Sequence, residues 1–248
     1  MSATGAGAAG AVAPADAPRL ESLRVEWLGR VRYADALALQ EERLEARRRG
    51  RSGDVLLLLE HPPVVTLGRS ARREHLLVPP EGLAARGIEL HEVARGGDVT
   101  YHGPGQLVGY LIVDLAARGR PDVGAFLRRI EAVLIGALAE LGVEGYARPG
   151  WTGVFASGPL RATAQQPRKI ASIGIGLRGW VTWHGFALNT TLDPAAFDPI
   201  VPCGLHEVAM TSVARELGAA AAGDLDGRAR DVVSRAFERD LAGAEGLR

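Results

Sequence analysis

Apolar residues along the chain follow two spacings, one typical of helices and one typical of strands. Apolar positions at helical spacing predict helices over 33–49, 122–141 and 226–241, and another that begins at Thr211 or Ser212. Short apolar runs predict strands over 55–59, 64–67, 88–93, 107–115, 170–177 and 181–188. Because helices and strands mix without a regular β-α-β alternation, their order favours an α+β fold over a doubly wound one.

The length of the chain, 248 residues, is enough for a full hydrophobic core and favours a single domain over 19–248. The segment 1–18 is mostly Ala, Gly and Pro, with Asp16 as its only charged residue, and it predicts a disordered tail. It has neither the basic start and long apolar stretch of a secretory signal nor the arginines of a transit peptide, so a cytoplasmic location is expected. The polar stretch 157–168 is interpreted as a surface loop.

The charge of the chain is balanced, with 29 Lys and Arg residues against 29 Asp and Glu residues. A formal net charge of zero gives no broad attraction to nucleic acid or to an anionic membrane, so neither is expected as a partner. The longest wholly aliphatic run, 55–59, is far too short to cross a bilayer.

Cys203 is the only cysteine in the chain, so it cannot form an internal disulfide or a multi-thiolate metal site. Two interpretations remain, a small inert core residue or a thiolate nucleophile. Pro199 and Pro202 restrict the backbone before the thiol, and Gly204 is expected to let a second molecule approach closely. This setting favours the nucleophile.

The stretch 95–106, Arg-Gly-Gly-Asp-Val-Thr-Tyr-His-Gly-Pro-Gly-Gln, is the densest unusual segment. Its four glycines and one proline are expected to exclude a regular element, and its backbone amides suit a ligand-binding loop. The alternative is a tight structural turn with incidental polar groups. It is not a Walker or Rossmann phosphate-binding motif, and His102 could be either a base or a structural residue.

Lys169 leads directly into the apolar run 170–177, whereas most lysines are solvated surface charges. An ammonium beside a cysteine favours the thiolate, and adjacent strands would allow Lys169 and Cys203 to meet. A Cys-His-Asn triad is also conceivable, with Asn189 and with His184, His206 or His102 as the histidine. The remaining histidines, His61, His75 and His91, show no ligand spacing, so no metal site is expected.

These segments together resemble the lipoyl(octanoyl) transferase family over about 28–213 of the chain. The resemblance rests on 95–106, on Arg-Lys-Ile-Ala-Ser-Ile-Gly at 168–174, on His-Gly-Phe-Ala-Leu-Asn at 184–189 and on Pro-Cys-Gly at 202–204. It implies a mixed β-sheet flanked by helices, like the catalytic domain of biotin and lipoate protein ligases. It also implies octanoyl transfer from acyl carrier protein to a lysine of lipoyl domains, a step of protein lipoylation.

Carried over residue by residue, the resemblance makes Cys203 the acyl-accepting nucleophile and Lys169 the partner that favours its thiolate. It implies substrate contacts from Arg95, Gly96, Gly97, Asp98, Val99, Thr100, Tyr101 and His102, from Ser172, Ile173 and Gly174, and from Gly185, Phe186 and Ala187. The implied partners are octanoyl-acyl carrier protein and the lipoyl domains of 2-oxoacid dehydrogenase complexes and of the glycine cleavage H protein. No ATP, metal or other cofactor is implied.

The chain departs from the family pattern in two places, a longer stretch at 148–154 and an apparent insertion at 157–168. Because both stretches precede Lys169, we expect these departures to affect how the partner proteins reach the site. The alternatives to an octanoyltransferase are an ATP-dependent lipoate or biotin ligase of the same fold, a cysteine hydrolase, and a non-catalytic module that binds acyl carrier or lipoyl domains.

Overall fold

The computed structural model describes residues 22–119, 121–157, 166–204, 207–221 and 223–242. The tail predicted at 1–18, His206 and most of the predicted loop at 157–168 lie outside these residues. In chain order the main elements are β1 (Arg24–Arg30), α1 (Tyr33–Arg48), β2 (Val55–Glu60), β3 (Val64–Leu67), α2 (Pro80–Ala85), β4 (Glu89–Glu92), β5 (Val99–His102), β6 (Gln106–Ile112), α3 (Val123–Glu140), β7 (Gly145–Ala147), β8 (Val154–Ala156), β9 (Arg168–Arg178), β10 (Val181–Asn189), β11 (Ala209–Met210), α4 (Val213–Leu217) and α5 (Leu225–Leu241).

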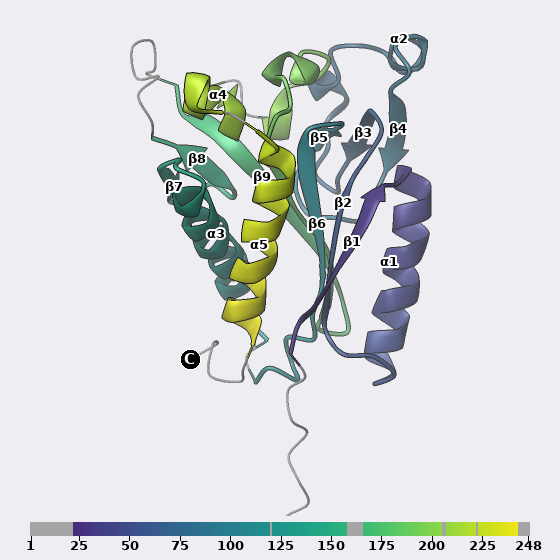
Figure 1. Cartoon of the computed structure of the whole chain (residues 1–248). Helices are drawn as coiled ribbons and strands as arrows, with labels where there is room; N and C mark the ends of the chain where they lie inside the picture. Colours follow the sequence, from purple (N-terminus) through teal and green to yellow (C-terminus); the bar gives the residue numbers. More distant parts are fainter. Residues whose placement is uncertain (1–21, 120, 158–165, 205–206, 222, 243–248) are drawn as a thin grey trace, which may run out of the picture.

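A large mixed sheet forms the centre of the molecule, with strand order β1-β2-β6-β10-β9-β8-β7 (Figure 1). β1 runs parallel to β2, the other neighbours along this path are antiparallel, and β11 adds to β9 in parallel. A second sheet has the order β4-β3-β5. The helices α3 and α5 lie on one side of the large sheet and α1 on the other (Figure 1). The predicted α+β fold with a mixed, helix-flanked sheet is confirmed.

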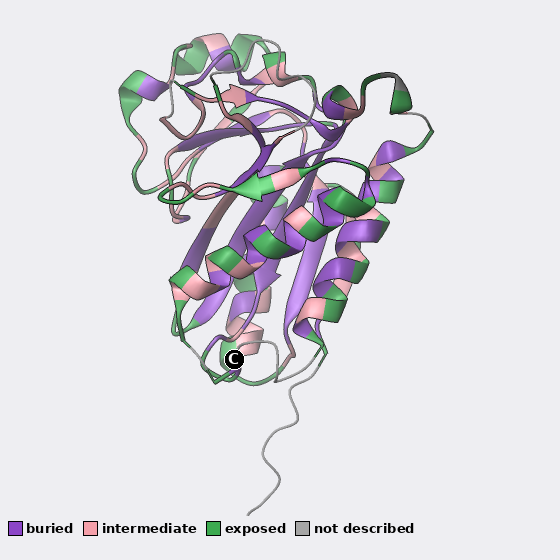
Figure 2. Cartoon of the chain, turned by 90° about the vertical axis from the view of Figure 1, so that its left-hand side faces the viewer, coloured by how far each residue is buried: buried purple, intermediate pink, exposed green. Residues whose placement is uncertain are grey.

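The apolar run of β2 is buried because both faces of the large sheet are covered. Leu56 and Leu58 belong to the core beneath α3 and α5, whereas Val55, Leu57 and Leu59 belong to the core beneath α1. Successive side chains of a strand point to opposite faces, so an uninterrupted apolar run fits a strand buried on both sides. In Figure 2 the strands of the large sheet are largely buried, whereas the helices that cover it carry exposed residues on their outward sides.

The three helices predicted with both ends are confirmed to within one residue at each end, and the helix expected to begin at Thr211 or Ser212 is α4, which begins at Val213. The Asp122 side chain caps α3 by accepting a hydrogen bond from the backbone N–H of Ala125, 2.9 Å away, and Asp224 caps α5 in the same way. Gly142, with φ of 87°, follows the end of α3. None of the described helices combines the length and the hydropathy needed to cross a bilayer.

The expectation that 95–106 contains no regular element is wrong, because Val99–His102 forms β5 and pairs antiparallel with β3. Three successive residues with high strand propensity, Val99 to Tyr101, are enough once a partner strand is available. The sequence analysis also missed β1, β7, β8 and β11. The last three have only two or three residues each. In β1, Arg-Val-Glu-Trp-Leu-Gly-Arg, polar residues interrupt and flank the apolar ones, so no apolar run marks the strand.

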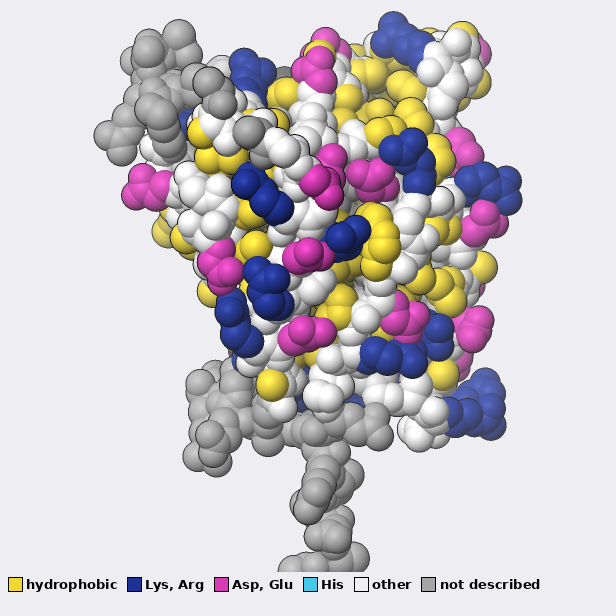
Figure 3. Space-filling model, in the orientation of Figure 1, with side chains coloured by type: hydrophobic (Ala, Val, Ile, Leu, Met, Phe, Trp, Pro, Cys, Tyr) yellow, Lys and Arg dark blue, Asp and Glu magenta, His cyan; other side chains and the backbone are white. Residues whose placement is uncertain are grey.

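The face that carries α3 and α5 has basic and acidic side chains interspersed, without a broad patch of one sign (Figure 3). Several of these charges form pairs between the two helices, such as Arg129 with Asp240 and Arg239 with Glu140. This arrangement agrees with the balanced composition of the chain.

Candidate active site

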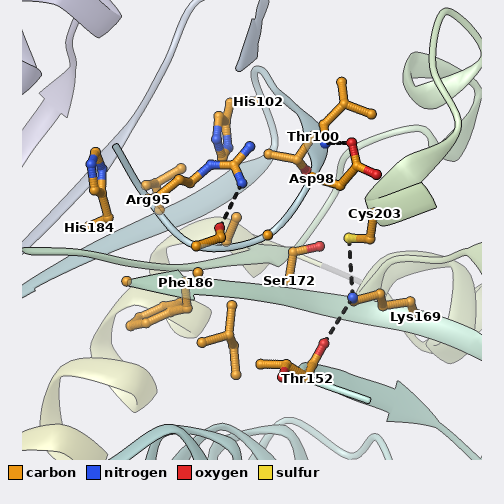
Figure 4. Close-up of a pocket in the computed structure, with 18 of the residues that line it drawn as sticks. Arg95, Asp98, Thr100, His102, Thr152, Lys169, Ser172, His184, Phe186 and Cys203 are labelled. Carbon is orange, nitrogen blue, oxygen red and sulfur yellow. Dashed lines mark hydrogen bonds between the residues drawn. The ribbon is translucent and has the colours of Figure 1, made fainter. Parts of the chain in front are cut away.

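Lys169 and Cys203 meet at the mouth of a cavity. The Nζ atom of Lys169 lies 3.3 Å from the Sγ atom of Cys203 and 3.0 Å from the carbonyl oxygen of Thr152 (Figure 4). Lys169 is only 2% exposed, which is unusual for a lysine. Its strand, β9, pairs with β8 on one side and with β11 on the other, so the backbone of Lys169 is held from both directions.

Cys203 has a left-handed backbone conformation, with φ of 57° and ψ of 17°. This conformation is unfavourable for a residue with a Cβ atom, and such strain concentrates at functional sites. The turn is fixed by two backbone hydrogen bonds, from the N–H of Gly204 to the carbonyl of Val201 and from the N–H of Val201 to the carbonyl of His75. The strain was not visible in the sequence, where proline restriction was the only signal.

One side of Gly204 packs closely against the protein itself, while the expectation that a second molecule approaches this glycine stays a prediction. Gly204 has φ of 67°, and a Cβ atom there would lie 2.6 Å from Oδ2 of Asp98 and 2.7 Å from Cε1 of His75. His75 and Asp98 are hydrogen-bonded to each other. The close neighbour of this glycine is therefore a histidine-aspartate pair of the protein itself.

The cavity has a volume of about 290 Å³. With the exception of Tyr101, the predicted site residues line it: Arg95, Gly96, Gly97, Asp98, Val99, Thr100, His102, Lys169, Ser172, Ile173, Gly174, Gly185, Phe186, Ala187 and Cys203. Residues that the sequence analysis did not place there also line it: Tyr33, Val108, Tyr110, Gly150, Trp151 and Thr152. The stretch 148–154, which departs from the family pattern, thus reaches the site.

Tyr101 lies outside this cavity. Its ring packs against Phe197, with ring centroids 5.8 Å apart, in the small core beneath the second sheet. Side chains alternate along β5, so His102 and Thr100 can face the cavity while Tyr101 faces away from it.

A second cavity, of about 520 Å³, meets the first at Cys203. Both are lined by Gly97, Asp98 and Cys203. The remaining lining residues of the second cavity are Ser70, Arg72, Glu74, His75 and Gly204. The thiol thus stands between a largely apolar space and one lined mainly by polar and charged residues.

Arg95 fixes the shape of the glycine-rich loop. Its Nη2 atom donates to the carbonyl oxygen and to Oγ1 of Thr66, both 2.8 Å away, and its Nη1 atom donates to the carbonyl of Gly96. Burial lowers the pKa of Arg95 from its usual value. The N–H of Gly96 donates to the carbonyl of Ile175, 2.8 Å away, which ties the loop to β9.

The described part of the site does not support the proposed Cys-His-Asn triad. Asn189 accepts a hydrogen bond from Gln106 and donates one to the carbonyl of Thr211, while Gln106 also holds Nδ1 of His102 at 2.7 Å. The hydrogen-bond partner of Cys203 is Lys169. The third candidate histidine, His206, lies outside the described residues.

The buried histidines of this region are neutral. Burial lowers the pKa of His102 to about 3, that of His184 to about 3 and that of His61 to about 4. His184 has φ of 56°, and both of its ring nitrogens are buried without a hydrogen-bond partner. Within the described residues, no three His, Cys, Asp or Glu side chains form a group that could hold a metal ion.

Comparison with known proteins gives a consistent result. The family model described as the lipoyl protein ligase A/B catalytic domain matches residues 32–232. An octanoyltransferase of Myxococcus xanthus is 49% identical over 201 residues, covering 81% of this chain and 55% of that protein. An octanoyltransferase of Acidobacterium capsulatum is 49% identical over 196 residues, covering 77% of this chain and 78% of that protein.

Solved structures share the fold at low sequence identity. Lipoate-protein ligase A bound with ATP has a TM-score of 0.66 and 17% identity, with 88% of this chain and 85% of that chain covered. The bipartite lipoate protein ligase of Thermoplasma acidophilum has a TM-score of 0.64 and 18% identity, with 88% and 83% covered. From the family match and the octanoyltransferase relatives, the chain belongs to the lipoyl protein ligase A/B catalytic domain family and, within it, to the octanoyltransferases.

Proposed function

We propose that the protein transfers an octanoyl group from acyl carrier protein to a lysine of apo lipoyl domains, through a thioester on Cys203. The observation that carries this proposal is the 3.3 Å contact between the buried Lys169 ammonium and the Cys203 sulfur at the mouth of an apolar cavity. The choice of octanoyl as the acyl group is inferred from the relatives, which are octanoyltransferases, and the choice of a lipoyl domain as the acceptor is inferred from the family.

In the first step, the Cys203 thiolate attacks the carbonyl carbon of the octanoyl thioester. The bond between that carbon and the sulfur of the carrier's pantetheine arm breaks. The departing thiolate takes a proton from the Lys169 ammonium, and the octanoyl group remains on Cys203 as a new thioester. One thioester replaces another, so this step needs no ATP.

In the second step, the amine of the acceptor lysine attacks the Cys203 thioester. The neutral Lys169 removes the proton that this amine must lose, and the bond to the Cys203 sulfur breaks. An amide forms on the acceptor, and the thiolate and the ammonium are restored together. Amide formation from a thioester is downhill, so neither a metal nor a nucleotide is required.

The two cavities fit the two parts of the acyl donor on either side of its thioester, the octanoyl chain and the pantetheine arm. The largely apolar cavity of about 290 Å³ would hold the eight-carbon chain, whose burial contributes about 0.8 kcal/mol per methylene. The second cavity, lined mainly by polar and charged residues, would admit first the pantetheine arm and then the acceptor lysine. Cys203 lies where both meet, which is where the reacting carbonyl must sit.

The developing oxyanion requires hydrogen-bond donors near Cys203, each worth roughly 3–4 kcal/mol of barrier. The N–H groups of Gly96 and Gly204 are already engaged by backbone carbonyls. The donors would therefore come from other amides of the glycine-rich loop. The other substrate contacts proposed from the sequence are supported by residues that line the first cavity; Tyr101 does not line it.

Several wider expectations remain predictions: a single domain over 19–248, a cytoplasmic location, and acceptors that include the lipoyl domains of 2-oxoacid dehydrogenases and the glycine cleavage H protein. A transfer assay tests the function directly. Octanoyl-acyl carrier protein and an apo lipoyl domain, mixed with the enzyme without ATP, should give an octanoylated domain. Modification that appears only with free octanoate and ATP would instead identify a ligase, and rapid release of free octanoate would identify a hydrolase.

A further inference from the structure

Glu131 is a buried carboxylate on α3, only 1% exposed, in a helix whose buried side is otherwise apolar. Its Oε1 atom accepts a hydrogen bond from the backbone N–H of Gly153, 2.8 Å away. Its Oε2 atom lies 2.6 Å from Nη1 of Arg128. A buried carboxylate without partners is strongly unfavourable, so both contacts are needed to keep Glu131 in this position.

Arg128 extends this pair to the stretch that precedes β8. Its Nη1 atom donates to the carbonyl of Trp151 at 3.3 Å, and its Nη2 atom donates to Oγ1 of Thr152 at 3.4 Å. Glu131 and Arg128 together therefore hold three successive residues, Trp151, Thr152 and Gly153.

The same three-residue stretch holds Lys169. The carbonyl of Thr152 accepts a hydrogen bond from Nζ of Lys169 at 3.0 Å (Figure 4). Gly153 has φ of 127°, and a Cβ atom there would lie 2.6 Å from Cε of Lys169 and 2.6 Å from the carbonyl oxygen of Ala171. The backbone at Gly153 thus packs directly against the lysine stem and cannot shift without moving it.

We infer that Glu131 is a positioning residue for the Lys169–Cys203 pair. It acts through the 151–153 backbone, which sets the distance of the lysine ammonium from the thiol. The relevance to catalysis rests on the proposed function, but the effect on the thiol does not. Glu131 touches neither the cavity nor Cys203, and the sequence offered no signal for it beyond a charged residue among apolar helix positions.

The test compares Glu131→Ala with Glu131→Gln and with Arg129→Ala. Glu131→Gln keeps an oxygen that can accept from Gly153, whereas Glu131→Ala removes it. Arg129, like Glu131, is on α3; Arg129→Ala breaks its ion pair with Asp240 of α5 and leaves 151–153 untouched. The readouts are the rate of Cys203 alkylation by iodoacetamide between pH 5 and pH 10 and the thermal midpoint of each variant.

We expect Glu131→Ala to lower the alkylation rate at pH 7 about tenfold and to move the inflection of the profile to higher pH, because a displaced ammonium no longer favours the thiolate. Glu131→Gln should stay within about threefold of the original protein, since the hydrogen bond survives. Arg129→Ala should lose thermal stability and keep the original profile. A folded Glu131→Ala protein with an unchanged profile would overturn the inference.

If Glu131→Ala does not fold, Glu131→Leu gives the same test, because leucine fills similar space without a buried charge and also lacks the acceptor for the N–H of Gly153. Its profile should move in the same direction, and an unmoved profile would overturn the inference. Alkylation uses no acyl donor, so it does not depend on the proposed reaction. A failure of octanoyl transfer in the unmodified protein would contradict the proposed function and leave this test valid.

Discussion

The Nζ atom of Lys169 lies 3.3 Å from the sulfur of Cys203, although 33 residues separate them in the chain. Among the described residues, no carboxylate forms an ion pair with Lys169; its other hydrogen-bond partner is the neutral carbonyl of Thr152. The sulfur of Cys203 is therefore the side-chain atom that the structure places against this lysine. This contact is the geometric basis of the role that we propose for Lys169 in catalysis.

Replacing Lys169 by methionine should keep the shape of the stem and remove the charge. We expect the rate of Cys203 alkylation at pH 7 to fall by about tenfold or more, since an opposite charge within about 4–6 Å typically changes ionisation by one to three pH units. The measurement is the rate of iodoacetamide labelling across pH. An identical profile in Lys169→Met would show that the lysine does not control the thiol.

Ala187→Val should shorten the acyl chain that the enzyme prefers. Ala187 lines the apolar cavity, and the two carbon atoms that valine adds reduce the volume open to an octanoyl chain. Two methylenes are worth about 1.6 kcal/mol, so the ratio of kcat/KM for octanoyl over hexanoyl thioester should fall roughly tenfold. The ratio serves as its own control for misfolding. A constant ratio would place the acyl chain elsewhere.

The buried histidines predict a loss of stability between pH 6.5 and pH 5. His61, His102 and His184 have folded pKa values of about 4, 3 and 3, below the ordinary value of 6.5, so the unfolded chain binds protons more tightly. Their contribution to the free energy of unfolding is complete above pH 6.5, and it declines as the pH falls toward the pKa values of the folded state. Each can reduce the free energy of unfolding by up to about 1.4 kcal/mol per pH unit.

Urea unfolding at pH 7, 6 and 5 measures this slope, in a window above most carboxylate titration. His61→Gln provides the comparison, because glutamine can replace contacts to the Val31 carbonyl and the Tyr110 hydroxyl without taking up a proton. The variant should show a shallower slope. Equal slopes in both proteins would mean that His61 is not kept neutral by folding.

The left-handed backbone of Cys203 predicts an unusual order of stabilities. Cys203→Gly should be more stable than Cys203→Ala by up to about 1 kcal/mol, because glycine adopts φ near 57° without the strain that a Cβ atom introduces. Both variants lack the thiol, so the comparison isolates the backbone. Chemical unfolding of the two proteins measures the difference, and a more stable alanine variant would contradict the strain.

Much of the fold followed from sequence periodicity. The helix over 123–140 and the buried strand at 55–60 were visible because their apolar residues repeat at the spacing of regular elements. β5 was missed because flanking glycines suggested a loop, and only its pairing with β3 makes it a strand. Pairing between distant segments is a tertiary effect that local propensity cannot supply.

For the site, residue types and their local motifs indicated Cys203 and Lys169, but not their distance. The direction of Tyr101 depended on the register of β5, which the sequence did not reveal. Thr152 contributes a backbone carbonyl, and Glu131 acts through a backbone N–H, so neither carries a side-chain signature of the site. Such contacts become visible only when the fold brings the segments together.

The most direct test of the central proposal is an intact mass measurement after incubation with octanoyl-acyl carrier protein, without ATP and without an acceptor domain. We expect one octanoyl adduct per chain that hydroxylamine removes and that Cys203→Ser does not form as a thioester. Absence of the adduct, together with modification of a lipoyl domain only when free octanoate and ATP are supplied, would contradict the account and reduce Cys203 to a structural residue.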